Sequence, residues 1–475
     1  MFRRDLKPPI SDEQQALFDE GHKVGALAQQ LFPGGKDATP ETYFDFSDAI
    51  DNTSKWIKEG IQTIYEAAFF HDEVMAALDI LHHHLGEKWA IEVKSSAAVK
   101  DYHITDASLQ YWVMSHAGFV PDKFFLMHIN NGYVKQGAID PKGLFTLEDI
   151  TEQVLANQAW VEQNIAKLKL INKNEEPNVE IGAHCSKPFP CDYINYCWSH
   201  IPDKSVFELG NARGKQWELY RNGILNLAAI PEDIDLNHRQ RLQVEGVRNG
   251  ASYIDKEAIT AFISNWQYPL YFFDFETIFP TIPVLNGTRP YQQVPFQYSL
   301  HIVTGPDAPL QHKEFLVDPK DFNDASTTDP RRRLLAQLKY DMGNVGNIVA
   351  YNAPFELGVL KNLALAFPEE APFLEDLISR FVDLLIVFRN AWYYKPEMGA
   401  SASIKSVLPA IDKSFSYTNL DIKDGGSASS RFLSMIKGTL TSDELEDRSK
   451  LLEYCKRDTE GMVIIWKELM KQTGG

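Results

Sequence analysis

The pattern of apolar and polar positions predicts a mixed N-terminal part in which helices and strands alternate. Apolar residues at helical spacing predict helices over residues 11–31 and 104–117 and a long amphipathic helix around 147–169. Alternating segments rich in aromatic and β-branched residues predict two antiparallel strands within residues 61–81 and a third over residues 89–95. The three histidines that begin residues 82–87 are expected to form an exposed turn between these strands.

The pattern changes twice further along the chain. Residues 203–268 carry helical spacing and few strand signals, so we expect a helical connector there. From residue 269 the chain is rich in strand signals, which predict strands at 294–303 and 313–317, and helices then alternate with strands to the C-terminus. The expected organisation is α/β, with one domain over residues 1–202 and another over residues 269–475.

Composition and charge narrow the class of protein. The chain of 475 residues is 44% hydrophobic and 24% charged, which is typical of a globular protein. No apolar run approaches the ~20 residues of a membrane span, and the N-terminal Met-Phe-Arg-Arg lacks the apolar stretch of a signal peptide. We therefore expect a cytoplasmic protein that has no membrane partner. The net charge of −18 argues against a broadly basic surface, although clustered metal-binding carboxylates would themselves raise the acidic count.

Two carboxylates stand one residue apart at the end of an apolar run. Asp274 and Glu276 lie in Tyr-Phe-Phe-Asp-Phe-Glu-Thr, and the two-residue period of a strand places them on one face. Two acids there repel each other unless a cation lies between them. Hard oxygen ligands hold Mg²⁺ or Mn²⁺ against a phosphate, so the pair indicates metal-dependent phosphodiester chemistry.

Three later segments add polar groups in similar settings. Asn352 and Glu356 lie where an apolar strand runs into a helix, and Asp383 follows Phe-Val in another apolar segment. Tyr454 and Asp458 are four residues apart, one turn along a predicted helix. Asp383 is expected to cap or terminate a strand, with catalysis as the alternative.

This set resembles the DEDDy branch of the DnaQ-like 3′→5′ exonucleases, which have an RNase H-like fold. The resemblance implies that Asp274 bridges two metals, that Glu276 and Asp458 each help to hold one, and that Tyr454 orients the attacking water. Glu356 stands where that family usually has Asp, and it would act through a metal-bound water. The alternative is a degenerate domain of the same fold that binds nucleic acid without cutting it.

A second set of charged residues lies in the N-terminal part. Asp79 is on one predicted strand, and Glu92 and Lys94 share a face of the next strand. The acids can hold a divalent cation, and the lysine can position water and offset phosphate charge. The alternative for Glu92 and Lys94 is a solvated charge pair. Glu66, on the preceding strand, is a further candidate acid.

These residues resemble the PD-(D/E)XK nucleases of restriction-endonuclease-like fold, in particular the RecB-like branch. Gln110 matches the glutamine of that branch's Gln-x-x-x-Tyr helix, and Gly21-His22 resembles its Gly…His segment. The resemblance implies that Asp79, Glu92 and His22 hold metal, and that Lys94 and Gln110 assist cleavage.

Three of the four cysteines cluster after this region, at Cys185, Cys191 and Cys197, with His200 just beyond. Such spacing in a reducing compartment indicates a metal site. RecB-like nucleases bind a [4Fe–4S] cluster with cysteines at this place and one more near the N-terminus, which this chain lacks. The cluster therefore needs another ligand, a histidine or one on a segment missing from the start. The alternatives are Zn²⁺ with His200 as the fourth ligand, or three free buried thiols. Cys455, beside Asp458, is assigned to the C-terminal domain.

The order of these features resembles an uncharacterised bacterial family that joins a RecB-like nuclease, a cysteine cluster and a DnaQ-like exonuclease. The resemblance implies a two-headed nuclease that uses Mg²⁺ or Mn²⁺ at both sites. We expect it to act on DNA in repair, defence or processing. RNA processing and a nucleic-acid-binding scaffold with silent heads remain alternatives, since neither motif distinguishes ribose from deoxyribose.

Overall fold

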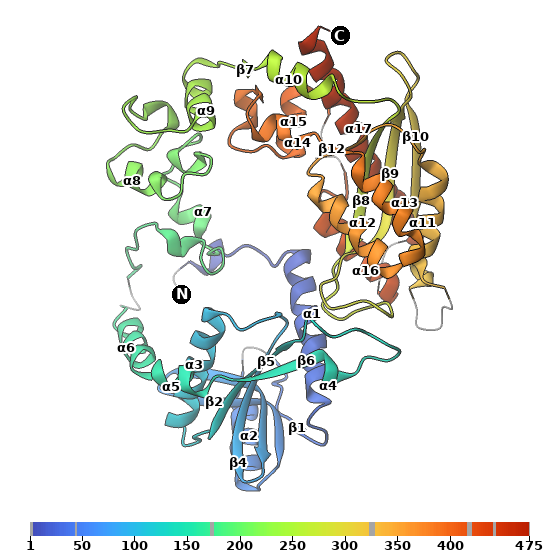
Figure 1. Ribbon diagram of the computed structural model, residues 1–475. Helices are drawn as coiled ribbons and strands as arrows, with labels where there is room; N and C mark the ends of the chain where they lie inside the picture. The colour runs from blue at the N-terminus through green and yellow to red at the C-terminus, as the bar shows by residue number, and fades with distance from the viewer. Residues whose placement is uncertain are drawn as a thin grey trace. The chain divides into compact units, whose positions relative to one another are not determined.

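The structure is a computed structural model, and it describes residues 3–42, 45–171, 175–322, 328–415, 420–439 and 443–474. The chain is of mixed α/β type and divides into two compact units (Figure 1). Unit 1 comprises Met1–Ile194 and Pro280–Gln292, and unit 2 comprises Asn195–Phe279 and Gln293–Gly475. The predicted connector is counted within unit 2, whereas a segment between two strands of unit 2 is counted with unit 1.

Unit 1 is built on one six-stranded sheet in which the strands follow their order in the chain. The strands are β1 (Lys36–Asp37), β2 (Thr63–His71), β3 (Val74–His84), β4 (Glu87–Lys94), β5 (Lys123–Ile129) and β6 (Phe145–Asp149). β2, β3 and β4 form an antiparallel meander, and β4 then pairs in parallel with β5. A parallel pair needs a long crossover connection, and here the helix α3 (Asp101–His116) supplies it.

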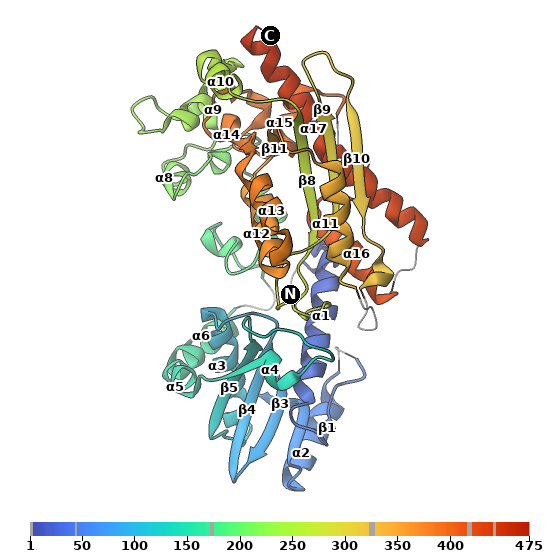
Figure 2. The ribbon, with the colours of Figure 1, turned by 45° about the vertical axis from the view of Figure 1, so that its right-hand side comes forward.

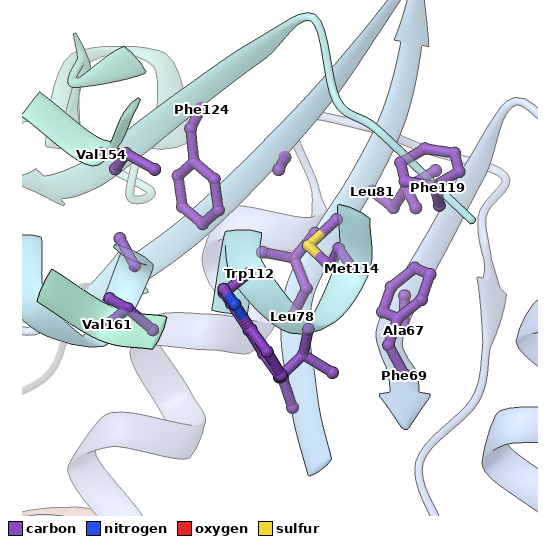
Figure 3. Close-up of a cluster of buried hydrophobic side chains, with 14 of the residues drawn as sticks. Ala67, Phe69, Leu78, Leu81, Trp112, Met114, Phe119, Phe124, Val154 and Val161 are labelled. Carbon is purple, nitrogen blue, oxygen red and sulfur yellow. The ribbon is translucent and has the colours of Figure 1, made fainter. Parts of the chain in front are cut away.

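Helices cover both faces of this sheet. On one face, Val24 and Ala28 of α1 (Asp12–Gln29) pack with Ile80 and Ile91 of the sheet. On the other face, Trp112 of α3 belongs to a cluster of buried apolar side chains that Figure 3 shows in close-up. That second cluster also takes side chains from α2 (Ser47–Lys58), α5 (Thr151–Ala156) and α6 (Gln158–Lys169). The remaining helices are η1 (Arg4–Leu6), α4 (Pro141–Leu144) and η2 (Ala183–Cys185), while α7 (Ile194–Cys197) begins at the last residue of the unit's first segment.

Unit 2 is built on a five-stranded mixed sheet with the order β10-β9-β8-β11-β12. Its strands are β8 (Leu270–Ile278), β9 (Val294–Val303), β10 (Gln311–Leu316), β11 (Ile348–Ala350) and β12 (Phe381–Asp383). β8 is central: it pairs antiparallel with β9 and parallel with β11. Because β8 is covered on both faces, most of its residues are apolar, and the two acids near its end stand out.

The 30-residue helix α17 (Glu444–Thr473) runs along β8, β9 and β10 (Figure 2). Asp443 caps its N-terminus, and three acids in its first turn favour the helix dipole. On the opposite face, Tyr298 of β9 donates a hydrogen bond to Asp341 at the end of α11 (Pro330–Asp341). The sheet is therefore held between α17 and α11.

The other elements of unit 2 flank this sheet or precede it. The helices beside the sheet are α10 (Lys256–Ile263), α12 (Pro354–Ala366), α13 (Ala371–Ser379), α14 (Leu385–Arg389), α15 (Ile404–Ile411) and α16 (Gly425–Lys437). The predicted connector contains η3 (Val206–Glu208), α8 (Lys215–Arg221), η4 (Leu227–Ala229), α9 (His238–Asn249) and β7 (Tyr253–Ile254), and β7 pairs with β13 (Tyr393–Tyr394). Short 3₁₀ turns complete the set at η5 (Pro319–Asp321), η6 (Pro368–Glu370) and η7 (Pro396–Met398).

Two of the element predictions are wrong. Residues 82–84 form the end of β3 rather than a turn, because His82, His83 and His84 pair across the sheet with Trp89, Lys88 and Glu87. The stretch around 147–169 is not one helix: it begins in β6, and α5 and α6 follow as two helices that meet at Asn157. Among the described residues, no helix is long and apolar enough to cross a membrane.

Candidate active sites

Asp274 and Glu276 lie near the end of β8, on the face that α17 covers. In the part of the chain that the structure describes, one group of three His, Cys, Asp or Glu residues has its ligand atoms within 4.8 Å of one another, namely Asp274, Glu276 and Cys455. Cys455 is buried on α17, and its thiol is 3.5 Å from Asp274 Oδ2. The strand thus presents its two acids to the helix, as its two-residue period predicts.

The same turn of α17 carries the other two residues of the C-terminal motif. Tyr454 is 4% exposed and its hydroxyl hydrogen-bonds Asp458. The charge of Asp458 acts on Asp274, Glu276 and Tyr454, so all four groups share one environment. Tyr454 is one turn before Asp458, and this spacing brings both side chains to the face of α17 that meets β8.

Glu356 enters the same cluster from the start of α12. Pro354 occupies the first turn of this helix, where its missing N–H costs nothing. Glu356 is 2% exposed, and its Oε2 has no hydrogen-bond partner. The carboxylate of Asp274 is the charge that acts most strongly on it. A buried carboxylate oxygen without a partner is costly, so this atom indicates a place for a cation or a proton.

The backbone before α12 is strained, and Asp383 holds it. Asn352 has a φ of 76°, which is uncommon for a residue other than glycine. Its N–H donates a 2.9 Å hydrogen bond to Asp383 Oδ1, and the same oxygen accepts from Leu385 N at 3.0 Å. Asp383 therefore terminates β12 and fixes the turn that leads to Glu356, which is the capping role expected for it.

The pKa values of this cluster shift strongly upward. Burial is the main cause for Asp274, Glu276 and Glu356, and the neighbouring carboxylates raise each pKa further. Like charges in a low-dielectric site disfavour ionisation of every member. A divalent cation would reverse this, because its charge offsets several carboxylates at once. The donor set of carboxylate oxygens fits Mg²⁺ or Mn²⁺.

Lys405 is a cationic residue near this cluster that the sequence motifs did not single out. It lies on α15, its ammonium is 5.8 Å from the centre of the Tyr454 ring, and it donates to the carbonyl of Lys423. Its charge opposes the upward shift in the pKa of Glu276. Gly425, the first residue of α16, also lies close to Glu276 Oε2. Only the fold reveals this, because Lys405 and Glu276 are far apart in the chain.

The N-terminal residues gather at a cavity of about 760 Å³ within unit 1. Lining it are Glu66, Asp79, Glu92 and Lys94 from the sheet and His22 from α1. Glu66 and Asp79 face each other where the pairing of β2 with β3 is interrupted, and Glu66 has a φ of 53°. At this break Glu66 and Asp79 are not paired in the β-ladder, and both line the cavity.

Lys94 is held between two carboxylates. Its ammonium donates to Glu92 Oε1 at 2.7 Å and to Asp106 Oδ2 at 2.8 Å. Glu92 is buried and its other oxygen has no partner. Asp106 is a site residue that the sequence reasoning missed. The sequence could have indicated Asp106, because it lies on α3 one turn before Gln110. Gln110 is itself buried with an unpartnered Oε1, and it is not among the residues that line the cavity in the described structure.

Burial dominates the titration of this second cluster as well. It raises the pKa of Glu66 to about 7, with the charges of Glu92 and Asp37 adding to the shift. Burial also raises the pKa of Asp79, with the charge of Glu66 adding to the shift, and the pKa of Glu92, with the charge of Asp79 adding to it. Burial lowers the pKa of the Lys94 ammonium, but the two carboxylates next to it together outweigh burial and raise the pKa, so Lys94 stays charged. The four acids Glu66, Asp79, Glu92 and Asp106 around one lysine leave an excess of negative charge that fits a divalent cation.

The cysteine segment has a different character. Cys185 is buried, Cys191 and Cys197 are exposed, and no cysteine of the chain forms a disulfide. The backbone N–H of Cys191 donates to the carbonyl of Cys185 at 2.9 Å. His200 contacts the Tyr220 hydroxyl through Nε2 and the carbonyl of Cys197 through Nδ1. These thiols are not among the described ligand atoms that lie within 4.8 Å of one another as a group of three, so metal binding here stays a prediction.

Comparison with known proteins gives relatives without an assigned activity. Residues 271–403 match a family described as "Domain of unknown function (DUF2779)", a span that includes Asp274, Glu276 and Glu356. The chain is 25% identical over 210 residues to "Uncharacterized protein MG366" of Mycoplasma genitalium, covering 41% of this chain and 31% of that protein. It is 26% identical over 233 residues to the "Uncharacterized protein MG366 homolog" of Mycoplasma pneumoniae, covering 44% and 34%.

A third relative covers more of the chain. It is "Uncharacterized protein UU173" of Ureaplasma parvum, 25% identical over 349 residues, or 68% of this chain and 49% of that protein. The chain thus spans from 31% to 49% of the length of these curated relatives. No solved structure matches it.

Proposed function

We propose that this chain is a metal-dependent nuclease with two phosphodiesterase sites, one on the six-stranded sheet of unit 1 and one on the five-stranded sheet of unit 2. The observation that carries the proposal is the buried carboxylate cluster of unit 2, where Glu356 Oε2 lies without a partner beside Asp274 and Glu276. Burying several acids together is unfavourable unless they bind protons or cations. Such a cluster, with the phenol of Tyr454 and the ammonium of Lys405 beside it, lowers the stability of the fold but provides the groups that phosphate chemistry needs.

At the C-terminal site the proposed reaction is 3′→5′ removal of nucleotides, by an RNase H-like domain of the DEDDy type. Asp274, Glu276 and Asp458 would hold Mg²⁺ or Mn²⁺, and Glu356 would act next to them. The cations, when bound, would stabilise charge on the attacking and leaving oxygens. The Tyr454 hydroxyl, which hydrogen-bonds Asp458, would orient the water that attacks. Lys405 would offset charge on the substrate phosphate.

At the N-terminal site the proposed domain is a PD-(D/E)XK nuclease of the RecB-like type. Asp79, Glu92 and Glu66 would hold a divalent cation in the cavity, with His22 lining its edge. Lys94 would contact the phosphate as a permanent cation, because the two carboxylates next to it keep it charged. The orphaned Oε2 of Glu92 supports this assignment.

The cysteine segment would bind a separate metal centre. Cys185, Cys191 and Cys197 supply three soft ligands, which suit a [4Fe–4S] cluster or, with His200, Zn²⁺. A brown colour and broad visible absorbance in freshly purified protein would favour the iron–sulfur cluster, and a colourless protein that contains zinc would favour the alternative.

DNA is the proposed substrate, with RNA as the second candidate. The experiment uses the full-length protein with end-labelled single- and double-stranded DNA and RNA, in Mn²⁺, in Mg²⁺ and in EDTA. Asp274→Asn should abolish stepwise shortening from the 3′ end, and Lys94→Ala should abolish the second activity, each by at least about 100-fold. Glu369→Gln and Lys123→Ala, which change only exposed ion pairs, serve as matched controls.

The outcomes separate the candidates. Degradation that persists in the Asp274→Asn, Lys94→Ala double variant would overturn both site assignments. Nucleic-acid binding in wild type without any cleavage, together with no Mn²⁺ binding by calorimetry, would favour the scaffold over the enzyme.

A further inference from the structure

Cys455 lies inside the carboxylate cluster of unit 2, where hard-metal chemistry has no need of sulfur. It is fully buried on α17, directly after Tyr454 and three residues before Asp458. Its thiol donates toward Asp274 Oδ2 at 3.5 Å and is 3.8 Å from the backbone carbonyl of Asp274. The sequence placed Cys455 in this domain without giving it a role.

The sulfur is close enough to the two acids for one ion to reach all three. Ligand atoms of Asp274, Glu276 and Cys455 lie within 4.8 Å of one another. Two ligands bound to a zinc-class ion at about 2.0–2.3 Å can lie at most about 4.6 Å apart, so small side-chain rotations would complete the set. The unpartnered, 2% exposed Oε2 of Glu356 is an independent sign that this cluster has room for a cation.

The identity of the ion follows from ligand softness. Mg²⁺ takes oxygen ligands and gains little from a thiol. Zn²⁺, Cd²⁺ and Co²⁺ bind thiolate together with carboxylate, with affinities that exceed those of Mn²⁺ at mixed sites. Binding replaces the thiol proton: the Sγ–H bond breaks, an Sγ–metal bond forms and H⁺ passes to solvent.

We propose that Asp274, Glu276 and Cys455 form a mixed carboxylate–thiolate site that selects zinc-class cations over Mg²⁺, and that such a cation blocks the C-terminal active site. The inference rests on the proposed exonuclease function for its consequence, inhibition by Zn²⁺, but not for the binding of the metal.

The binding test is spectroscopic and uses Co²⁺ alone as the probe. Cobalt bound to a thiolate gives a sulfur-to-metal charge-transfer band in the near ultraviolet, and oxygen ligands give none. Wild type, Cys455→Ser and Asp274→Asn are titrated with Co²⁺ at the full chain length. We expect one component of the band to be lost in both variants. Cys191→Ser, which changes the separate cysteine segment, should retain that Asp274-dependent component.

The two variants of this site remove different ligands of the proposed metal. Serine preserves a hydrogen-bond donor toward Asp274 but removes the soft ligand. If the thiol of Cys455 only positions Asp274, the charge-transfer band of Cys455→Ser should equal that of wild type. That result would overturn the proposal. If Cys455→Ser does not fold, as judged by circular dichroism, Asp274→Asn tests the same site with the thiol in place. A band identical to that of wild type in Asp274→Asn also overturns it.

Activity is measured in parallel with 3′-labelled single-stranded DNA in Mn²⁺. The zinc concentration that halves trimming should rise by at least about tenfold in Cys455→Ser. If Asp274→Asn abolishes trimming but Cys455→Ser leaves the cobalt band unchanged, this inference is overturned and the proposed exonuclease function stands. A Cys455-dependent band in a protein that trims nothing would support the metal site and overturn the exonuclease.

Discussion

At the scale of single residues, both candidate sites bury carboxyl groups close together, which is unfavourable when the groups are ionised. Glu66 shows the effect most clearly, because it is only partly buried and its pKa rises to about 7 by desolvation and by the charges of Glu92 and Asp37. Its φ of 53° adds backbone strain at the same residue. Features that lower stability at a defined cavity are expected where a protein binds a ligand.

The first prediction concerns the pH dependence of stability without metal. Because the folded-state pKa of Glu66 lies above its ordinary value of 4.5, the folded state binds more protons than the unfolded state between pH 4.5 and about 7. Stability therefore falls as pH rises through this window, by at most about 3 kcal/mol from this group. Glu66→Gln should flatten the fall and raise the thermal midpoint at pH 8 in EDTA.

The control for Glu66→Gln is Glu152→Gln, which changes an exposed acid on α5. Mn²⁺ should stabilise wild type more at pH 8 than at pH 5, because protons compete with the metal for the carboxylates. Glu66→Gln should lose part of that metal-dependent gain. Equal stabilisation by Mn²⁺ in wild type and Glu66→Gln would contradict a role for Glu66 in metal binding.

At the scale of elements, strand ends and helix starts deliver the site residues. The turn from β11 into α12 is the clearest case, since Asp383 at the end of β12 binds the N–H of strained Asn352 and thereby sets the start of the helix that carries Glu356. An amide oxygen can make the same two hydrogen bonds as the carboxylate, whereas a methyl group can make neither.

The second prediction follows from this difference. Asp383→Ala should lower the free energy of unfolding of unit 2 by about 1–3 kcal/mol, because the backbone N–H groups of Asn352 and Leu385 lose their shared acceptor. It should also weaken Mn²⁺ binding and 3′-end trimming, as Glu356 is displaced. Asp383→Asn should retain most of both. If asparagine abolishes trimming as fully as alanine while the protein stays folded, Asp383 is a metal ligand rather than a positioning residue.

The sequence predicted elements well where local pattern decides them. β9 spans the predicted residues 294–303, and α1 and α3 lie where helical spacing placed them. The prediction for the three histidines was wrong because a cluster of polar aromatic residues suggests a turn. In the structure, cross-strand ring contacts extend the strand, such as that of His84 with Trp89, whose ring centroids are 4.2 Å apart. The predicted helix around 147–169 failed because alternation in β6 was mistaken for helical spacing.

The site was predictable only in part, for a related reason. Motif spacing identifies residues that share one strand or one helix turn, such as Asp274 with Glu276 and Tyr454 with Asp458. Lys405 and Asp106 reach their sites through tertiary packing, which no local pattern encodes. Cys455 is next to Tyr454 in the sequence, yet its importance depends on the 3.5 Å approach to Asp274.

At the scale of the whole molecule, the two units are not consecutive in the chain. Segment Pro280–Gln292 leaves β8 of unit 2 two residues after the strand ends and is counted with unit 1. There Asn286 Oδ1 accepts from Gly137 N at 2.8 Å and from the buried Lys135 ammonium at 3.3 Å. The Tyr291 hydroxyl donates to the carbonyl of Ser95, next to Lys94. The chain therefore passes directly from the strand that carries Asp274 into a segment that packs within unit 1.

The last prediction tests the packing of this segment. Asn286→Ala removes an acceptor from a buried ammonium and from a backbone N–H, which should destabilise unit 1 by about 1–3 kcal/mol although the residue follows a strand of unit 2. Hydrogen exchange read peptide by peptide should become faster in residues 129–137 and 280–292 and stay unchanged in β9 and β10. Asn164→Ala, on an exposed turn of α6, is the matched control and should change neither. Faster exchange confined to unit 2 would contradict the assignment of this segment to unit 1. Faster exchange in β8 as well would instead mean that loss of the contacts of this segment also loosens the strand with which it is continuous in the chain.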